Sequence, residues 1–328
     1  MLAVLVREFG RPEDLNVEDV VSPACGPDEI RIDVRATAVN FVDLLVVGGT
    51  YQFLPPRPFT PGKLPAGVVE AVGANVMQLK PGDRVLTMAE QGGYAQQAVA
   101  AAAGAFQLPD SMSFTDAAAM ALGFDTGWFA LRERGRLQPG ESVLVLGATG
   151  SVGLASVQLA KAFGAQVLAG VSSLQSADAV RAAGADHVID LSVAELREGL
   201  RAQVHAATGG RGADVIVDCL GDRFFQPALR ALAWSGRLVV VGFAAGEIPT
   251  VRANYLLVKN IEVSGLQVSD YRKRMPELMR RCFEEIFQLF EQGRLAPPRV
   301  MTVPLPEASA ALVAVRDRTA GQRIVLTP

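Results

Sequence analysis

Short β-type runs separated by turns occupy the chain up to about residue 110. The clearest runs lie at 29–39, 66–73 and 83–88, and the tripeptide PGD at 81–83 forms a turn before the third. Such runs, bounded by turn residues, predict strands. The opening segment MLAVLVREFG also predicts a strand, because a signal peptide needs a basic start and a longer apolar core. The first third of the chain is therefore predicted to be rich in β-structure.

From about residue 115 the apolar runs become continuous and alternate with helical stretches. These runs lie at 142–147, 165–171, 213–219 and 236–242. Strands that are apolar on both faces and separated by helices are typical of a parallel sheet covered on both sides. The pattern predicts an α/β domain of the Rossmann type, with a doubly wound parallel sheet.

After Pro249 the alternation stops in the sequence pattern. An amphipathic helix is predicted over about 276–292, with Gly293 at its C-cap. The tail from 297 predicts a strand, a helix and a last strand that return to the first domain. We therefore expect a domain at 124–254 inserted into one formed by 1–123 and 255–328.

Composition narrows the class of protein. The 328 residues, 50% hydrophobic and 20% charged, fit about two globular domains. A net charge of −3 provides no strong positive field for nucleic acid or an anionic membrane. No apolar run approaches the roughly 20 residues that span a bilayer. Three scattered cysteines, at 25, 219 and 282, fit a reduced cytoplasmic protein.

The glycine-rich segment GATGSVG at 147–153 lies between a predicted strand and a predicted helix. Gly150 and Gly153 allow a tight turn and a close approach of a pyrophosphate, whose charge the amides at the helix N-terminus complement. Ala148 replaces the first glycine of GxGxxG. The segment predicts dinucleotide binding, and the alternative is a tight turn without a ligand. The candidate residues are Ala148, Gly150, Ser151, Val152 and Gly153.

The end of the second strand of this domain favours NADPH over NADH. An NAD-binding protein usually has an acidic residue there that holds the ribose 2′-hydroxyl. This chain has Ser172 and Ser173, which can donate to a 2′-phosphate. The nearest cations, Arg181, Arg318 and Arg323, are equally consistent with solvated surface charges.

Four segments together resemble one known family. VNFVDLL at 39–45, GATGSVG, LQPGESVLV at 137–145 and GADHVID at 184–190 are similar to the zinc-independent quinone oxidoreductases of the medium-chain dehydrogenase/reductase superfamily. The likeness covers nearly the whole chain. It implies a GroES-like β-domain completed by the C-terminal segment, a Rossmann domain between them, and a cofactor in the cleft.

The resemblance also implies site residues. Asn40 matches a residue near the nicotinamide and Tyr51 one at the mouth of the cleft. The residues that match cofactor contacts are Asn40, Thr126, Gly150, Ser151, Val152, Gly153, Ser172, Ser173, Gly242, Phe243 and Ala244, with Arg318 added from the tail. The chain departs from the family at Ser176 and Leu191, where relatives carry lysine and tyrosine. It also departs at Leu45, a second family tyrosine, and at Lys63 and Leu64, where an acidic residue is usual.

Metal and nucleophilic chemistry find no support in the residue pattern. The only histidines, His187 and His205, lie in the predicted Rossmann half, and a closed zinc site needs about four cysteine or histidine ligands. We therefore expect no metal. Hydride transfer leaves the hard step to the cofactor. Asn40 and Tyr51 are the candidates to hydrogen-bond the substrate oxygen. The alternatives are a packing lid residue for Tyr51 and a backbone-bonding turn residue for Asn40.

Three functions remain open on the sequence. The first is an NADPH-dependent reductase of quinones. The second is an ene-reductase of an enone, acrylate or enoyl thioester; a nucleotide-bearing thioester would need a basic patch, whereas Arg57 and Lys63 are expected to be solvated loop cations. The third is a non-catalytic NADPH-binding protein of the crystallin type. The resemblance further implies a homodimer, with the β-rich run at 260–268 as the edge.

Overall fold

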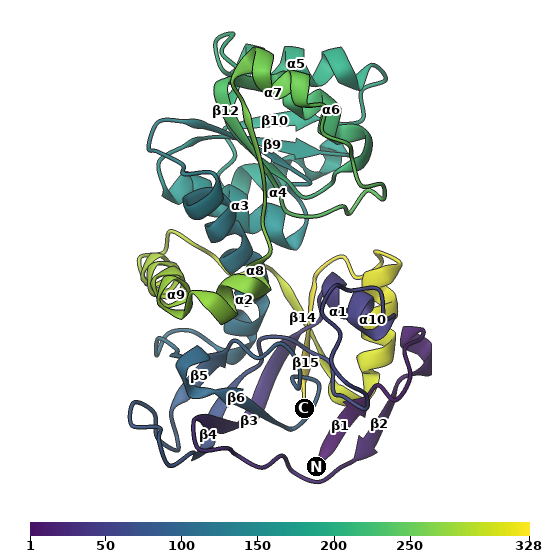
Figure 1. The fold of residues 1–328 in the computed structure, drawn as a ribbon, viewed down its shortest axis with the longest axis vertical. Coiled ribbons are helices and arrows are strands. Elements are labelled where there is room, and N and C mark those ends of the chain that lie inside the picture. Colours follow the sequence, from purple (N-terminus) through teal and green to yellow (C-terminus); the bar gives the residue numbers. More distant parts are fainter. The chain divides into compact units, whose positions relative to one another are not determined.

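The computed structural model describes all 328 residues. The chain forms two compact units (Figure 1). The first comprises Met1–Leu122, Arg272–Phe283 and Pro297–Pro328; the second comprises Gly123–Tyr271 and Glu284–Ala296. The division differs from the expected one in residues 255–271 and 284–296, which belong to the second unit.

A seven-stranded sheet is the centre of the first unit. Its order is β14 (Val300–Pro304), β15 (Arg323–Thr327), β3 (Glu29–Ala38), β4 (Ala66–Val72), β5 (Arg84–Thr87) and β7 (Ala105–Gln107), and β6 (Gln97–Ala101) also pairs with β3. In β3 the side chains of Ile30, Ile32 and Val34 are buried, as period-two alternation requires. Because β15 pairs antiparallel with β3, the C-terminal strand completes the N-terminal domain.

Smaller elements surround this sheet. β1 (Leu2–Leu5) and β2 (Asn16–Asp19) form a two-stranded ribbon. Helix α1 (Phe41–Val47) packs beside α10 (Ala308–Arg316), so that segments from opposite ends of the sequence meet (Figure 1). Three short 3₁₀ turns, η1 (Pro12–Asp14), η2 (Ala102–Gly104) and η5 (Leu305–Glu307), complete the unit.

The second unit contains the predicted parallel sheet. Its order is β10 (His187–Asp190), β9 (Gln166–Val171), β8 (Ser142–Leu146), β11 (Ala213–Asp218), β12 (Leu232–Val240) and β13 (Glu262–Gly265), and all pairs are parallel. All five residues of β8 are buried, which explains its continuous apolar run. The order reverses between β8 and β11, and ligands of such sheets bind outside the carboxyl ends of the strands at that point.

The remaining helices of the chain precede, connect or follow these strands in sequence. They are α2 (Phe114–Trp128), which continues into the π-helical turn η3 (Phe129–Arg134), α3 (Ser151–Ala162), η4 (Leu174–Ser176), α4 (Ala177–Ala182), α5 (Leu196–Ala207), α6 (Asp222–Ala231), α7 (Ala253–Lys259), α8 (Val268–Arg274) and α9 (Pro276–Glu291). None of the helices is long and apolar enough to cross a membrane.

The expectation that the alternation ends at Pro249 is wrong. Helix α7 and strand β13 follow that residue, and β13 pairs with β12 to extend the parallel sheet. Their sequences lack the usual apolar pattern for a physical reason. No residue of α7 is buried, and β13 is an edge strand without a fully buried position.

Candidate active site

The glycine-rich turn joins β8 to α3 at the point where the strand order reverses. Gly147 has φ = +74°, a conformation that glycine adopts without strain. Gly150 forms the N-cap of α3, and the first helical hydrogen bond runs from the Leu154 amide to the Gly150 carbonyl at 2.8 Å. The amides of Ser151, Val152 and Gly153 therefore precede the helical hydrogen-bond ladder, where a helix N-terminus attracts an anion.

Close packing explains why Gly153 is glycine. A Cβ atom there would lie 2.1 Å from the Gly147 carbonyl oxygen and 2.9 Å from the Ala148 Cα. At Gly150 the nearest atom to a Cβ, the Gly147 oxygen, would be 3.4 Å away. The turn therefore needs glycine at 153 for packing against the strand, whereas a Cβ at 150 would make only an ordinary contact. An uncrowded glycine beside amides at a helix N-terminus fits the pyrophosphate of a dinucleotide.

A second loop is fixed to the carboxyl end of the neighbouring strand β11. Oδ1 of the fully buried Asp218 accepts hydrogen bonds from the amides of Leu220 and Gly221, both at 2.9 Å. The backbone carbonyl of Asp218 accepts from Val241 at 2.8 Å, and the next carbonyl accepts from Ala244 at 3.1 Å. The predicted cofactor residues Gly242, Phe243 and Ala244 thus form a loop attached to the end of β11.

The predicted serines follow β9, the neighbour of β8 on its other side. Ser172 and Ser173 are both exposed, and the Ser173 hydroxyl accepts a hydrogen bond from the Gln175 amide at 3.3 Å. Arg181, the nearest cation in sequence, pairs with Asp178 at 3.5 Å. Leu191 is buried, and its amide donates to the Val171 carbonyl at 2.9 Å. The groups directly after β9 are therefore serine hydroxyls and backbone amides, with no acidic side chain among them.

The second unit contains most of the predicted cofactor residues. The glycine-rich turn, the serines after β9 and the loop 242–244 all follow carboxyl ends of its parallel strands. Thr126 belongs to this unit as well, in α2, and donates a hydrogen bond to the Asp125 carboxylate at 3.1 Å. Asn40, Tyr51 and Arg318 belong to the first unit. Arg318 is exposed directly after α10, with φ = +57°.

Asn40 is buried at the start of α1, and its side-chain amide is engaged within the protein. Nδ2 donates to the Ala38 carbonyl at 2.9 Å and to the Asp43 carboxylate at 3.3 Å, and Oδ1 accepts from the Arg323 guanidinium. A primary amide has two hydrogens, so none remains for a substrate oxygen. Asn40 retains one acceptor lone pair on Oδ1. This geometry favours an orienting role over hydrogen-bond donation to the substrate.

A buried polar network holds Asn40 in place. The Asp43 carboxylate accepts from the Asn40 backbone amide at 2.8 Å and from the Tyr94 hydroxyl at 2.9 Å. Burial raises the pKa of Asp43 despite these hydrogen bonds and the nearby Lys63. Burial and the Asp43 carboxylate raise the pKa of Tyr94 well above its usual value, so its hydroxyl remains a donor. Arg323 also donates to the Val39 carbonyl at 3.2 Å.

The sequence analysis missed most of this network. Asp43 lies three residues after Asn40, the spacing of a helix capping box, and that pattern was available in the sequence. Tyr94 and Arg323 come from distant segments and carry no local pattern. The pairing of β15 with β3 brings Arg323 to Asn40, and backbone hydrogen bonds of Tyr94 with Val4 and Pro61 hold Tyr94 in place.

Tyr51 lies beside a buried ion pair. The Lys63 ammonium is 5.4 Å from the centre of the Tyr51 ring and binds the Glu90 carboxylate. Lys63 is only 4% exposed, so the expectation that it is a solvated loop cation is wrong: the ammonium turns inward because Glu90 supplies the opposite charge. Arg57, by contrast, remains half-exposed, with its guanidinium paired with Glu8.

Glu90 is shared by two cations. Its second carboxylate oxygen accepts from Arg272 at 2.8 Å. Burial alone would raise the pKa of Glu90, but Arg272 and Lys63 outweigh it and hold the pKa at about 2. A cluster of three charged side chains therefore lies beside Tyr51, and it consists of Lys63, Glu90 and Arg272.

The remaining candidates for acid, base or metal chemistry do not converge. His187 Nε2 lies 3.1 Å from Gln166 Nε2 at the start of β10, and His205 lies on α5, where burial lowers its pKa. Burial and the Asp218 carboxylate raise the pKa of the Cys219 thiol to about 12, which keeps it protonated. No group of three or more His, Cys, Asp or Glu side chains is arranged to hold a metal ion, so the residues present do not fit a zinc site.

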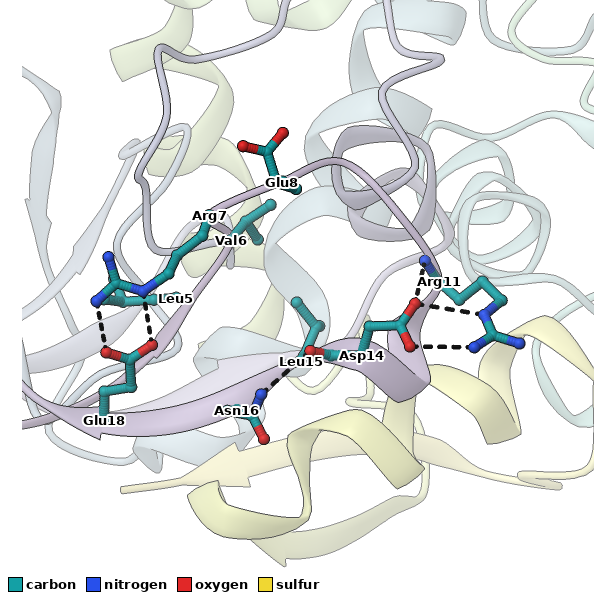
Figure 2. Close-up of a pocket in the computed structure, with 9 residues that line it drawn as sticks. All are labelled: Leu5, Val6, Arg7, Glu8, Arg11, Asp14, Leu15, Asn16 and Glu18. Atoms are coloured by element: carbon teal, nitrogen blue, oxygen red, sulfur yellow. Dashed lines mark hydrogen bonds and ion pairs between the residues drawn. The ribbon is translucent and has the colours of Figure 1, made fainter.

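A surface pocket of the first unit lies apart from these groups, along β1, η1 and β2. Figure 2 shows that both arginines lining it are paired with carboxylates of the same pocket. Arg7 binds Glu18 at 2.7 Å, and Arg11 binds Asp14 at 3.1 Å. With its cations neutralised in this way, the pocket presents no convergent set of groups for catalysis.

Comparison with known proteins gives consistent matches over nearly the whole chain. The model of the alcohol dehydrogenase GroES-like domain matches residues 26–110, and that of the zinc-binding dehydrogenase family matches residues 151–284. The quinone oxidoreductase-like protein 2 homolog of Nematostella vectensis is 38% identical over 328 residues, which cover 99% of this chain and 88% of that protein. The GroES-like match confirms the predicted fold of the first domain.

Solved structures agree with these matches. The quinone oxidoreductase of Pseudomonas syringae superposes with a TM-score of 0.91 at 30% identity and covers 100% of this chain and 99% of its own. The Escherichia coli quinone oxidoreductase, solved in complex with NADPH, gives a TM-score of 0.89 at 28% identity and covers 100% of both chains.

Proposed function

Because the chain belongs to the quinone oxidoreductases of the medium-chain dehydrogenase/reductase superfamily, we propose that it reduces quinones with NADPH and without a metal ion. The observation that carries the proposal is the glycine-rich turn at the strand-order reversal, followed on β9 by two exposed serines and no acidic residue. A carboxylate there would repel a 2′-phosphate, whereas serine hydroxyls donate to it. The NADPH complex of the E. coli relative supports the same cofactor.

The residues that would hold the cofactor follow the carboxyl ends of the parallel strands. The amides at 151–153 bind the pyrophosphate, and Ser172 and Ser173 bind the 2′-phosphate. Thr126, Ala148, Arg318 and the loop 242–244 are further contacts in this proposal. Asn40, locked by Asp43 and Arg323, offers its remaining Oδ1 lone pair as an acceptor that orients the nicotinamide.

When bound, NADPH supplies a hydride, and the quinone takes up that hydride and one proton to become a hydroquinone. Negative charge develops on the quinone oxygen as the hydride arrives. The Tyr51 hydroxyl donates a hydrogen bond to that oxygen, and the Lys63 ammonium, 5.4 Å from the Tyr51 ring centre, stabilises the charge electrostatically. Solvent delivers the proton.

We also propose that the protein acts in the cytoplasm as a homodimer. None of the three cysteines forms a disulfide, which suits the cytoplasmic location in this proposal. Strand β13 is the edge of the six-stranded sheet, and its unpaired backbone groups suit a homodimer formed edge to edge. A monomeric mass by light scattering at micromolar concentration would contradict the dimer.

Steady-state oxidation of NADPH and NADH, with a quinone and an enone offered in parallel to chelator-treated protein, tests the proposed function. We expect turnover with NADPH and quinone. The kcat/KM for NADH should be about tenfold lower, because the charged hydrogen bonds to the 2′-phosphate are lost. Turnover with the enone alone would make the protein an ene-reductase, and NADPH binding without any turnover would favour the non-catalytic function.

A further inference from the structure

Besides Lys63, Lys273 also has its ammonium group near the loop that contains Tyr51, Phe53 and Leu54. Its Nζ lies 4.7 Å from the centre of the Phe53 ring, and Phe53 packs edge-on against Tyr51 with ring centres 6.4 Å apart. No carboxylate pairs with this ammonium. A cation–π contact at an exposed site is weak, so a carboxylate or sulfonate can compete for the ammonium.

Lys63 approaches the same aromatic pair from within the unit. Its ammonium faces the Tyr51 ring, and Glu90, its carboxylate partner, also binds Arg272. Because Glu90 divides its single charge between two cations, it does not cancel both. Two cations from distant parts of the sequence, Lys63 and Lys273, therefore contact the two rings.

The surface of this loop is also apolar. Phe53 and Leu54 are 44% and 40% exposed, so aromatic and aliphatic surface is accessible beside the Lys273 ammonium. Exposed aromatic area suits a flat ring, and a flanking ammonium suits an anionic substituent on that ring.

We propose that the acceptor is an anionic quinone, one with a carboxylate or sulfonate on or beside its ring, and that Lys273 binds this group while Phe53 and Tyr51 contact the ring. The inference rests on the proposed function, because it takes Tyr51 to contact the quinone that accepts the hydride. The positive charge of Lys63 attracts the same anionic substituent from a greater distance. The chain's departure from the family pattern at Lys63 then has a substrate-selecting consequence.

The test compares naphthoquinone with naphthoquinone sulfonate as acceptors. For each variant we take the ratio of kcat/KM for the sulfonate to that for the neutral quinone, so that the different reactivities of the two acceptors cancel between variants. Lys273→Met should lower this ratio three- to tenfold, as expected for one partly exposed ion pair. Lys273→Arg should restore it, and raising the salt concentration should lower it in the wild type.

Lys80→Met is the matched control, since Lys80 is an exposed lysine of the same unit and lies outside the proposed site. Its ratio should equal that of the wild type. The proposal is overturned if Lys273→Met leaves the ratio unchanged or if Lys80→Met lowers it equally. If no quinone is reduced at all, the proposed function fails by itself. The same ratio taken from dissociation constants, measured by fluorescence quenching, then decides the inference.

Discussion

Replacing Gly153 by alanine should abolish NADPH binding and destabilise the second unit by about 3 kcal/mol. The added Cβ would lie 2.1 Å from the Gly147 carbonyl oxygen and 2.8 Å from its carbonyl carbon, both rigid backbone atoms. Helix α3 must therefore move away from β8, and the amides at its N-terminus move with it. Denaturant unfolding measures the stability, and a fluorescence titration measures NADPH affinity.

Gly150→Ala is the control for that experiment. Gly150 has φ = −73°, which alanine adopts freely, and the nearest atom to its Cβ would be 3.4 Å away. We expect wild-type stability but at least about tenfold weaker NADPH binding, because the methyl group occupies the space proposed for the pyrophosphate. Wild-type NADPH affinity in both variants would show that the turn does not bind the cofactor.

Replacing Glu90 by glutamine should cost about 3 kcal/mol of stability at neutral pH, because the poorly exposed cations Lys63 and Arg272 lose the carboxylate that both bind. The pKa of Glu90 is held at about 2 in the folded state, against 4.5 for a free glutamate. A depressed pKa stabilises the fold above the unfolded-state value, and this stabilisation is lost as the pH falls toward the folded-state value. The wild type should therefore lose stability between about pH 5 and pH 2.

The pH dependence separates this prediction from a general packing defect. Between pH 5 and pH 2 the free energy of unfolding of Glu90→Gln should fall less than that of the wild type, so the two curves converge. Glu18→Gln is the control, since Glu18 pairs with Arg7 at the surface, where solvent screens the charges. Parallel wild-type and Glu90→Gln curves would contradict the role assigned to this carboxylate.

The sequence predicted the elements whose pattern is local. Continuous apolar runs predicted β8, β9 and β11 because these strands are buried on both faces, and the glycine spacing at 147–153 predicted the turn that follows β8. The region of strand β13 was expected only as a β-rich edge at 260–268 and was counted with the first domain, because an edge strand needs no continuous apolar run. Its place becomes visible only through its pairing with β12.

In the candidate site, too, local motifs were predicted and tertiary contacts were not. Asn40 was identified from a short motif, yet its chemistry depends on Tyr94 and Arg323, which reach it only through tertiary packing. Lys63 was expected to be solvated because it lies in a segment read as a surface loop. Its partner Glu90 is 27 residues away, and no pattern in the sequence connects the two.

A single-turnover experiment tests the transfer of a hydride from NADPH to a quinone most directly. Protein loaded with NADPH is mixed anaerobically with excess quinone in a stopped-flow instrument, and NADPH absorbance is followed with ordinary cofactor and with cofactor deuterated at both C4 positions. The account predicts stoichiometric loss of NADPH, slower with the deuterated cofactor, in the presence of a metal chelator. Persistence of the NADPH absorbance, or its loss only after metal is added, would contradict it.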